Sequence, residues 1–444
     1  MTTVRRHVAR GAAALAAAAV LSVTAVPSAA SAAPAVPASP ASPADVTADE
    51  GTPAGPPAEL PAGMYGTTDP TYDGVWRQSL AMLAQRAVNV MPADSAVAWL
   101  LGQQCDSGAF PAYRPDTTKP CDATTVVDTN STAAAVQILA ALTTYPDAMN
   151  NGMSWLASVQ NKDGGWGYSA GAPSDANSTG LVIGALAAGG APVGTRLSTE
   201  GRSPYQALSS FAIPCDAKEG GGAFAYQPDK SGKLLPNADA TAAGLLGGIG
   251  KRMVTTGVEP GPGPVCQDLH PLTPERAARN GASYLVKALA KTGHLDQPPM
   301  PGADDSAPLP DHGNTADAVV ALTTAGYGKQ AVAPMKWLEK NSAAWAKENG
   351  PAAYAQLIFA AHTTSTDPRT FGGTDLVKAL NATGPAPKWI GPKPLTTAEQ
   401  QKVLADQKAE KHSMSGNIWT MAVGAFAALV ICALFVVRAK RRRS

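Results

Sequence analysis

The chain has 444 residues, of which 45% are hydrophobic and only 16% are charged, and its formal net charge is +1. Eight of its 35 basic residues lie in residues 1–32 and 438–444, whereas all 34 acidic residues lie between these two ends. The central part is therefore acidic, which excludes a function that depends on a broad basic surface, such as binding of nucleic acid.

The first 32 residues have the composition of an export signal. Three arginine residues precede an apolar, alanine-rich run from Gly11 to Val26, and the small residues Ala30–Ala32 form a cleavage site. We therefore expect residues 1–32 to be a removed signal peptide. Residues 33–71 are rich in Ala, Pro, Ser and Thr with few large apolar residues, so we expect a disordered linker there.

The C-terminal end predicts a membrane anchor. Residues 384–417 combine a proline-rich stretch with a polar helical run, which predicts a stalk. Ile418 to Val437 contains no charged residue and is long enough, at about 1.5 Å per residue, to cross a hydrocarbon core of roughly 30 Å. The basic tail, residues 438–444, is expected on the cytoplasmic side. These features predict a single-pass protein of the cell membrane whose main domain is extracellular.

Four of the five cysteines lie in the predicted extracellular part, and Cys432 lies in the predicted span. An even number of cysteines in an oxidising compartment predicts two disulfides. Of the three possible connectivities, we favour Cys105 with Cys121 and Cys215 with Cys266, because each pair brackets one loop between predicted helical stretches. No CxxC or CxxxH spacing occurs, so we expect no metal site.

Residues 72–383 contain a repeated pattern. Four segments begin with a polar cluster, in which a threonine follows an Asp or Asn by four positions, and continue as an apolar helical run; they cover 128–139, 175–186, 237–246 and 311–322. These runs are apolar on nearly all faces, which is typical of helices buried on every side. We expect them to be inner helices, with Ala352 to Ala361 as a further inner-like run and Val75 to Ala87 preceding the first.

Amphipathic runs lie between the inner ones and predict outer, half-exposed helices. They are Ser95 to Gln104, Gly152 to Gln160, Ser203 to Ala212, Glu275 to Leu289 and Val332 to Lys340, with Asp375 to Leu380 after them. No sustained alternation with a period of two residues predicts a strand. The domain is therefore predicted to be all-α, with five or six helical hairpins that either stack in an open superhelix or close into a barrel.

One loop motif favours the barrel. Gln160-x3-Gly164-Gly165-Trp166 resembles the QW repeat of squalene cyclases and protein prenyltransferases, whose fold is the closed α/α toroid. In the first unit Phe110 takes the place of the tryptophan, and in the third the glutamine is missing. The resemblance implies that residues 72–383 form an α/α toroid.

The chain lacks the catalytic motifs of these relatives. It has no DxDD motif for alkene protonation, no expected zinc triad and no GCGEQ thioester. Asn130-Ser-Thr132-Ala and Asp239-Ala-Thr241-Ala instead resemble helix starts of the intrinsic factor and transcobalamin family, secreted carriers of cobalamin. That resemblance implies cobalamin as a ligand, with His312 as the counterpart of a cobalt-coordinating histidine. Linker and stalk stand where that family has its C-terminal β domain.

A ligand site is predicted at one end of the barrel. Because the inner helices run parallel, their N-termini meet at one mouth, where polar and aromatic side chains form a binding basin. The candidate residues are Asp128, Asn130, Thr132, Asp175, Asn177, Thr179, Asp239, Thr241, Asp311, His312 and Asn314, together with Tyr113, Trp166, Tyr168 and Tyr226. The alternative is that the polar residues only cap their helices and the aromatics only pack over the rim.

The sequence thus favours a surface protein that binds a bulky, polar, cobalamin-like molecule without converting it, and a membrane transporter is one candidate partner. Two alternatives remain open. Two of the mouth carboxylates could form the acid–base pair of a glycan lyase or hydrolase. The outer helices could instead form a scaffold for another protein.

Overall fold

The computed structural model describes residues 60–268, 270–297 and 308–390, which belong to one compact unit. The predicted signal peptide, membrane span and basic tail lie outside the described residues. None of the helices in the described part is long and apolar enough to cross a membrane.

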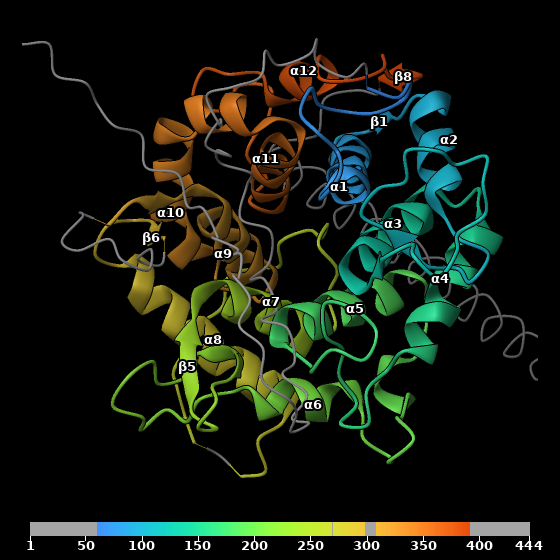
Figure 1. Ribbon diagram of the computed structural model, residues 1–444. Helices are drawn as coiled ribbons and strands as arrows, with labels where there is room; N and C mark the ends of the chain where they lie inside the picture. The colour runs from blue at the N-terminus through green and yellow to red at the C-terminus, as the bar shows by residue number, and fades with distance from the viewer. Residues whose placement is uncertain (1–59, 269, 298–307, 391–444) are drawn as a thin grey trace, which may run out of the picture. The chain divides into compact units, whose positions relative to one another are not determined.

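Six inner helices form a closed ring. They are α1 (Gly74–Ala87), α3 (Thr129–Leu142), α5 (Ala176–Ala188), α7 (Ala238–Gly248), α9 (His312–Thr324) and α11 (Ala343–Thr363). Each packs on the next, and α11 packs on α1, so the ring has no open edge (Figure 1). Of the two predicted arrangements, the ring is therefore the closed barrel and not the open superhelix. Of the five or six predicted hairpins, six are present in the described part of the chain.

An outer helix packs on each inner one, which completes the double ring of a toroid. The outer helices are α2 (Asp94–Gln103), α4 (Pro146–Ser158), α6 (Pro204–Ser210), α8 (Pro274–Leu289), α10 (Gly328–Asn341) and α12 (Leu376–Asn381); a short 3-10 helix, η1 (Val193–Thr195), precedes α6. All six overlap the amphipathic runs that the sequence predicts. The left-handed backbone of Gly350 interrupts α11, and only its second part matches the predicted inner-like run.

Small residues allow the inner helices to approach closely. A Cβ atom on Gly180 of α5 would lie 2.6 Å from the carbonyl oxygen of Ala243 on α7, which is well inside van der Waals contact. The helices are consequently buried both where they face the outer layer and where they face one another. This explains why their sequences are apolar on nearly every face.

Short strand pairs link the outer helices to the inner ones. The antiparallel pairs are β1 (Val90–Met91) with β8 (Trp389–Ile390), β2 (Phe110–Pro111) with β3 (Val127–Asp128), β4 (Phe224–Pro228) with β5 (Leu234–Asn237), and β6 (Leu295–Asp296) with β7 (Pro310–Asp311). β3, β5 and β7 each end at the residue that caps the following inner helix. Strands of two to five residues are too short to produce a recognisable alternation, which is why the sequence did not predict them.

The repeated polar cluster caps four of the six inner helices, α3, α5, α7 and α9, and anchors the loop before each of these four. At its first position Asp128, Asp175, Asn237 and Asp311 accept a hydrogen bond from the backbone N–H three residues later, at 2.6 to 2.9 Å. At its fifth position the hydroxyls of Thr132, Thr179, Thr241 and Thr315 accept from the backbone N–H of Phe110, Trp166, Phe224 and Leu295, at 2.9 to 3.1 Å. We call this five-residue unit the cap motif.

The domain begins earlier and ends later than the sequence predicts. Tyr65, within the predicted linker, is fully buried, and its hydroxyl donates to Gln85 at 3.0 Å. In the predicted stalk, β8 pairs with β1 and Lys388 forms an ion pair with Asp94. The described parts of both segments, residues 60–71 and 384–390, therefore belong to the toroid.

Both disulfides have the predicted connectivity, Cys105 with Cys121 and Cys215 with Cys266. The first brackets the loop between α2 and α3, as expected. The second encloses β4, β5 and the whole of α7, so the reasoning that each pair brackets a single loop holds only for the first.

One segment crosses the C-terminal end of the ring. In residues 251–258, which we call the strap, Met253 N–H donates to Oε1 of Gln137 on α3 at 3.0 Å. Further along, Gly257 N–H donates to the Thr363 carbonyl of α11 at 3.1 Å, and Val258 N–H to the Thr323 carbonyl of α9 at 3.4 Å. The strap thus connects α3, α9 and α11 across this end of the ring.

Replacing the threonine of a cap motif should lower the free energy of unfolding. In a Thr179→Val variant the buried Trp166 N–H loses its acceptor while the side-chain volume is kept, and an unsatisfied buried donor costs about 1–3 kcal/mol. Urea unfolding of this variant should show a loss in that range. Thr179→Ser, which keeps the hydroxyl and loses only a methyl group, is the matched control. Equal stability of the Val variant and the wild type would contradict an anchoring role.

Candidate functional site

A cavity of about 130 Å³ lies inside the ring, and all six inner helices contribute to its wall. Its lining comprises Trp76, Leu80, Asn130, Gln137, Asn177, Gly180, Leu181, Gly184, Asp239, Ala242, Ala243, Leu246, Asp317, Val320, Gln356 and Phe359, with Lys251 and Met253 from the strap. Polar side chains gather near the N-terminal ends of the helices, whereas the strap covers the opposite end.

The third position of the cap motif faces the cavity. Asn130 on α3, Asn177 on α5 and Asp239 on α7 occupy it, each in the first turn of its helix. Asn177 donates from Nδ2 to a carboxylate oxygen of Asp239 in a short hydrogen bond. From the sequence, Asp239 was expected to act like Asp128, Asp175 and Asp311. The residue that caps α7 is instead Asn237, so the Asp239 carboxyl faces the cavity.

A second carboxyl lies about one turn deeper. Asp317 projects from α9 and accepts a hydrogen bond from Nε2 of Gln356 on α11 at 3.1 Å. Burial and the neighbouring carboxylate of Asp239 raise the pKa of Asp317 to about 8. Burial raises the pKa of Asp239 to about 6, although the hydrogen bond from Asn177 acts in the opposite direction. At neutral pH Asp317 therefore carries a proton for much of the time.

No ion pair among the described residues involves either carboxyl. The only basic residue in the lining is Lys251, which belongs to the strap and is exposed. The described part of the chain also contains no group of three or more His, Cys, Asp or Glu residues arranged to hold a metal ion. At neutral pH a proton therefore neutralises Asp317 for much of the time, whereas no ion pair of the described residues offsets the charge of Asp239.

Three polar atoms of the lining residues have no hydrogen-bond partner among the described residues. They are Oδ1 of Asn130, Oδ1 of Asn177 and Nε2 of Gln137. The side chains are 7%, 8% and 2% exposed, so water outside the protein does not reach them freely. Because an unsatisfied buried polar atom is costly, these atoms require a partner inside the cavity.

Most of the other candidate residues do not line the cavity. Asp128 and Asp175 are buried caps, and Asp175 also accepts from the hydroxyl of Tyr226 at 3.4 Å. Tyr168 lies near Asp128, and burial raises its pKa. Asp311 is a cap that also accepts from Nδ2 of Asn314 at 2.7 Å. The capping alternative therefore accounts for these carboxylates, and the hydroxyls of Thr132, Thr179 and Thr241 serve to anchor loops.

Three of the aromatic or histidine candidates lie elsewhere. Trp166 is fully buried in the core, where its indole N–H donates to the Leu156 carbonyl at 2.7 Å, and it does not line the cavity. Tyr113 stacks on Trp99. The ring of His312 lies 4.9 Å from that of Trp337 and 5.3 Å from that of Trp345, so packing rather than an open coordination position defines its surroundings.

Asp317, Gln137 and Gln356 line the cavity but were not predicted from the sequence. A signal for them was present, because each is a polar residue within an otherwise apolar inner-helix run. Only their common orientation toward the ring interior, which depends on the rotation of α3, α9 and α11 about their axes, distinguishes them from buried structural residues.

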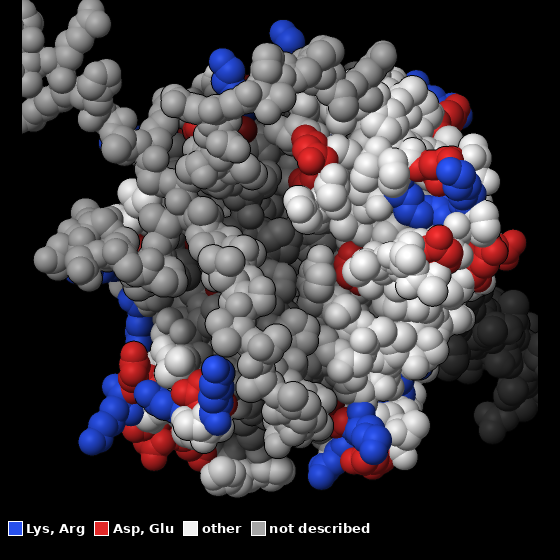
Figure 2. Space-filling view, in the orientation of Figure 1, with Lys and Arg blue, Asp and Glu red and all other residues white. Residues whose placement is uncertain are grey.

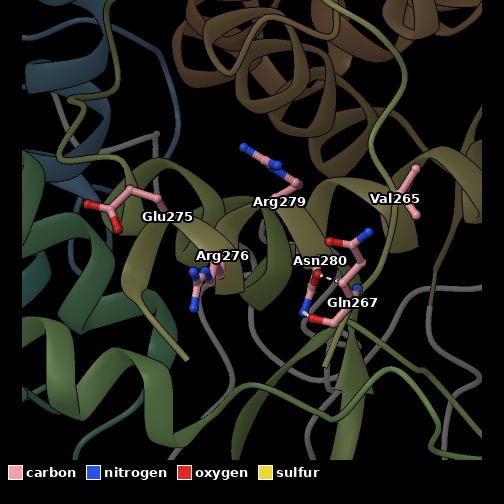
Figure 3. A pocket seen from close by; sticks show the side chains of 6 residues that line it. All are labelled: Val265, Gln267, Glu275, Arg276, Arg279 and Asn280. Atoms are coloured by element: carbon pink, nitrogen blue, oxygen red, sulfur yellow. Dashed lines mark hydrogen bonds between the residues drawn. The ribbon is translucent and has the colours of Figure 1, made fainter. Parts of the chain in front are cut away.

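A larger pocket of about 280 Å³ lies on the outer layer beside α8. Glu275, Arg276 and Arg279 leave the helix in different directions, and Asn280 is hydrogen-bonded to the backbone of Gln267 (Figure 3). On the face shown in Figure 2, lysine and arginine residues alternate with acidic residues around the periphery. Neither feature gives a convergent set of groups like that of the central cavity.

Comparison with known proteins gives only distant similarities. No family model and no curated protein matches the chain. Among solved structures, a protein from Actinoplanes has a TM-score of 0.43 at 15% identity, covering 68% of this chain and 93% of its own. The type II terpene cyclase MstE from Scytonema has a TM-score of 0.39 at 15% identity, covering 63% of this chain and 73% of its own.

A variant of MstE in complex with geranylgeranyl dihydroxybenzoate has a TM-score of 0.39 at 11% identity, covering 73% of this chain and 93% of its own. Similarity at this level says nothing about the chemistry of the present cavity. The toroid assignment therefore depends on the helix contacts described above.

The raised pKa of Asp317 predicts a pH-dependent stability. Between about pH 4, where the carboxyl ionises in the unfolded chain, and about pH 8, the folded protein holds a proton that the unfolded chain has lost. The contribution of this group to the free energy of unfolding thus falls with rising pH, by at most about 1.4 kcal/mol per pH unit.

An Asp317→Asn variant removes this dependence and keeps an acceptor for Gln356. Its melting temperature should exceed that of the wild type at pH 8.5, and the difference should shrink toward pH 5. A difference that is the same at both pH values would show that ionisation of Asp317 does not control stability.

Proposed function

We propose that this protein is a binding protein whose central cavity holds one compact, polar small molecule. The observation that carries the proposal is the set of buried polar atoms without partners, namely Oδ1 of Asn130, Oδ1 of Asn177 and Nε2 of Gln137, around one cavity. Together with Asp239 and Asp317 they offer hydrogen bonds that the chain itself does not use. A pocket with an apolar wall and a few convergent polar groups is typical of small-molecule sites.

The size of the cavity favours a compact ligand over the bulky one expected from the sequence. A cavity of about 150 Å³ accommodates benzene, and the present one, at about 130 Å³, is similar. A corrinoid with its macrocycle is many times larger, as is an oligosaccharide. The volume therefore weighs against cobalamin and against a glycan substrate inside the ring, and the packing of His312 between two tryptophans weighs against cobalt coordination.

We further propose that the toroid acts outside the cell and is held at the membrane by the predicted helix Ile418 to Val437. The two disulfides support an oxidising compartment. The arginine-rich start and apolar run of residues 1–32 support export. A transporter that receives the ligand is a partner consistent with this location.

A cavity-filling variant tests whether ligands bind inside the ring. Ala243 borders the cavity on α7, and Ala243→Phe would occupy most of the space. A panel of compact amines, alcohols, amides and carboxylates should contain a compound that raises the melting temperature of the purified wild type. At a hundred times its Kd such a ligand stabilises by about 2.7 kcal/mol. The Ala243→Phe variant should show no such shift.

The matched control is Val332→Phe, a substitution of similar size at an exposed position of the outer helix α10. It should respond to the ligand as the wild type does. If no compound of the panel shifts the melting temperature, or if Ala243→Phe responds fully, the proposal fails.

A further inference from the structure

If the central cavity binds a small molecule, as proposed above, its side chains indicate the chemical class of that molecule. Two carboxyl groups, of Asp239 and Asp317, line the same cavity, and neither forms an ion pair within the described residues. Ionising both without a cation would place two uncompensated negative charges in a poorly solvated space. A positively charged ligand would remove that cost, whereas a neutral or anionic one would not.

The unpartnered amide atoms indicate that the cation carries N–H donors. The Nδ2 group of Asn177 donates to Asp239, which fixes its Oδ1 as an acceptor without a partner. Oδ1 of Asn130, on the neighbouring helix, is a second buried acceptor without a partner. Two carboxyls and two amide oxygens together require several donors from one ligand, and an ammonium group supplies three.

The remainder of the cavity fits a short carbon skeleton. Trp76, Leu80, Val320 and Phe359 supply apolar and aromatic surface, and aromatic faces attract organic cations as well as hydrocarbon. The volume of about 130 Å³ leaves room for about as many atoms as benzene has.

From these observations we infer that the central cavity binds a compact organic cation, a primary ammonium compound of about six non-hydrogen atoms, with its ammonium group between Asp239 and Asp317. The ammonium takes the place of the proton that Asp317 otherwise holds. At the deeper end, the free Nε2 donor of Gln137 lies beside Gly184, in position to donate to a hydroxyl or carbonyl oxygen on the ligand.

A matched pair of probes tests the inference on the full chain. Cyclopentylamine and cyclopentanol have the same shape and differ in charge. Isothermal titration calorimetry at pH 8.5 should give at least tenfold tighter binding of the amine. At pH 6.0 the affinity for the amine should fall by at least about tenfold, because protons compete for the carboxyls. The titratable groups that face the site are Asp239, Asp317, Asp311 at the start of α9, and Lys251 of the strap.

Two variants distinguish an effect of the cavity carboxyls from an effect of removing any acidic residue. Replacing both carboxyls, by Asp239→Asn and Asp317→Asn together, should reduce the affinity for cyclopentylamine at least tenfold and leave that for cyclopentanol unchanged. The control is Asp375→Asn at the exposed cap of the outer helix α12, which should bind the amine as the wild type does. Circular dichroism checks that both variants remain folded.

Each contrary outcome has a separate meaning. Equal binding of the amine and the alcohol, or unchanged amine affinity in the double variant, would overturn the ammonium assignment; loss of that binding in Ala243→Phe would still support the proposed function. Binding of Ca²⁺ without binding of amines would also overturn it and would identify a metal site, since carboxylate and amide oxygens suit hard cations. If neither probe nor any other compact compound binds, the proposed function itself fails.

Discussion

Closure of the inner ring is the constraint on which the rest of the structure depends. Six helices whose axes lie about 8–10 Å from their neighbours must also lie about that far from the ring centre. A helix with its side chains has a radius of about 5–6 Å, so a channel a few ångströms in radius remains. Small residues at the helix contacts, such as Gly180 against Ala243, keep the ring tight, and the strap crosses one of its ends.

The cap motif uses one short sequence for three purposes. Its first residue caps the helix, its fifth anchors the preceding loop, and its third faces the ring interior. Since the inner helices pack side by side in the same direction, repetition of the motif collects the third-position residues Asn130, Asn177 and Asp239 at one level of the cavity. A binding site can thus arise by changing the third position while the two structural positions stay the same.

The carboxyls of Asp239 and Asp317 show how the ring shapes chemistry. In water each would be fully ionised at neutral pH, but burial raises the pKa of both, and the carboxylate of Asp239 raises that of Asp317 further. Asp317 is consequently protonated for much of the time at neutral pH and can then donate a hydrogen bond. The stability that is lost when such groups ionise can be recovered by a ligand of opposite charge.

The sequence by itself determined the local features of this protein. Apolar runs and their spacing predicted the inner and outer helices, and the Asp or Asn before each run predicted the caps, because both depend on neighbours close in the chain. Loop positions likewise predicted Cys105 with Cys121, whereas the pairing of Cys215 with Cys266, although predicted, encloses a whole helix. Only the tertiary structure decided which polar residues share the cavity. That depends on the rotation of each helix about its own axis, which long-range packing fixes and which turned Asp317, Gln137 and Gln356 toward the ring centre. Trp166 lies in the loop before α5, and its hydrogen bond to the Leu156 carbonyl holds it in the core.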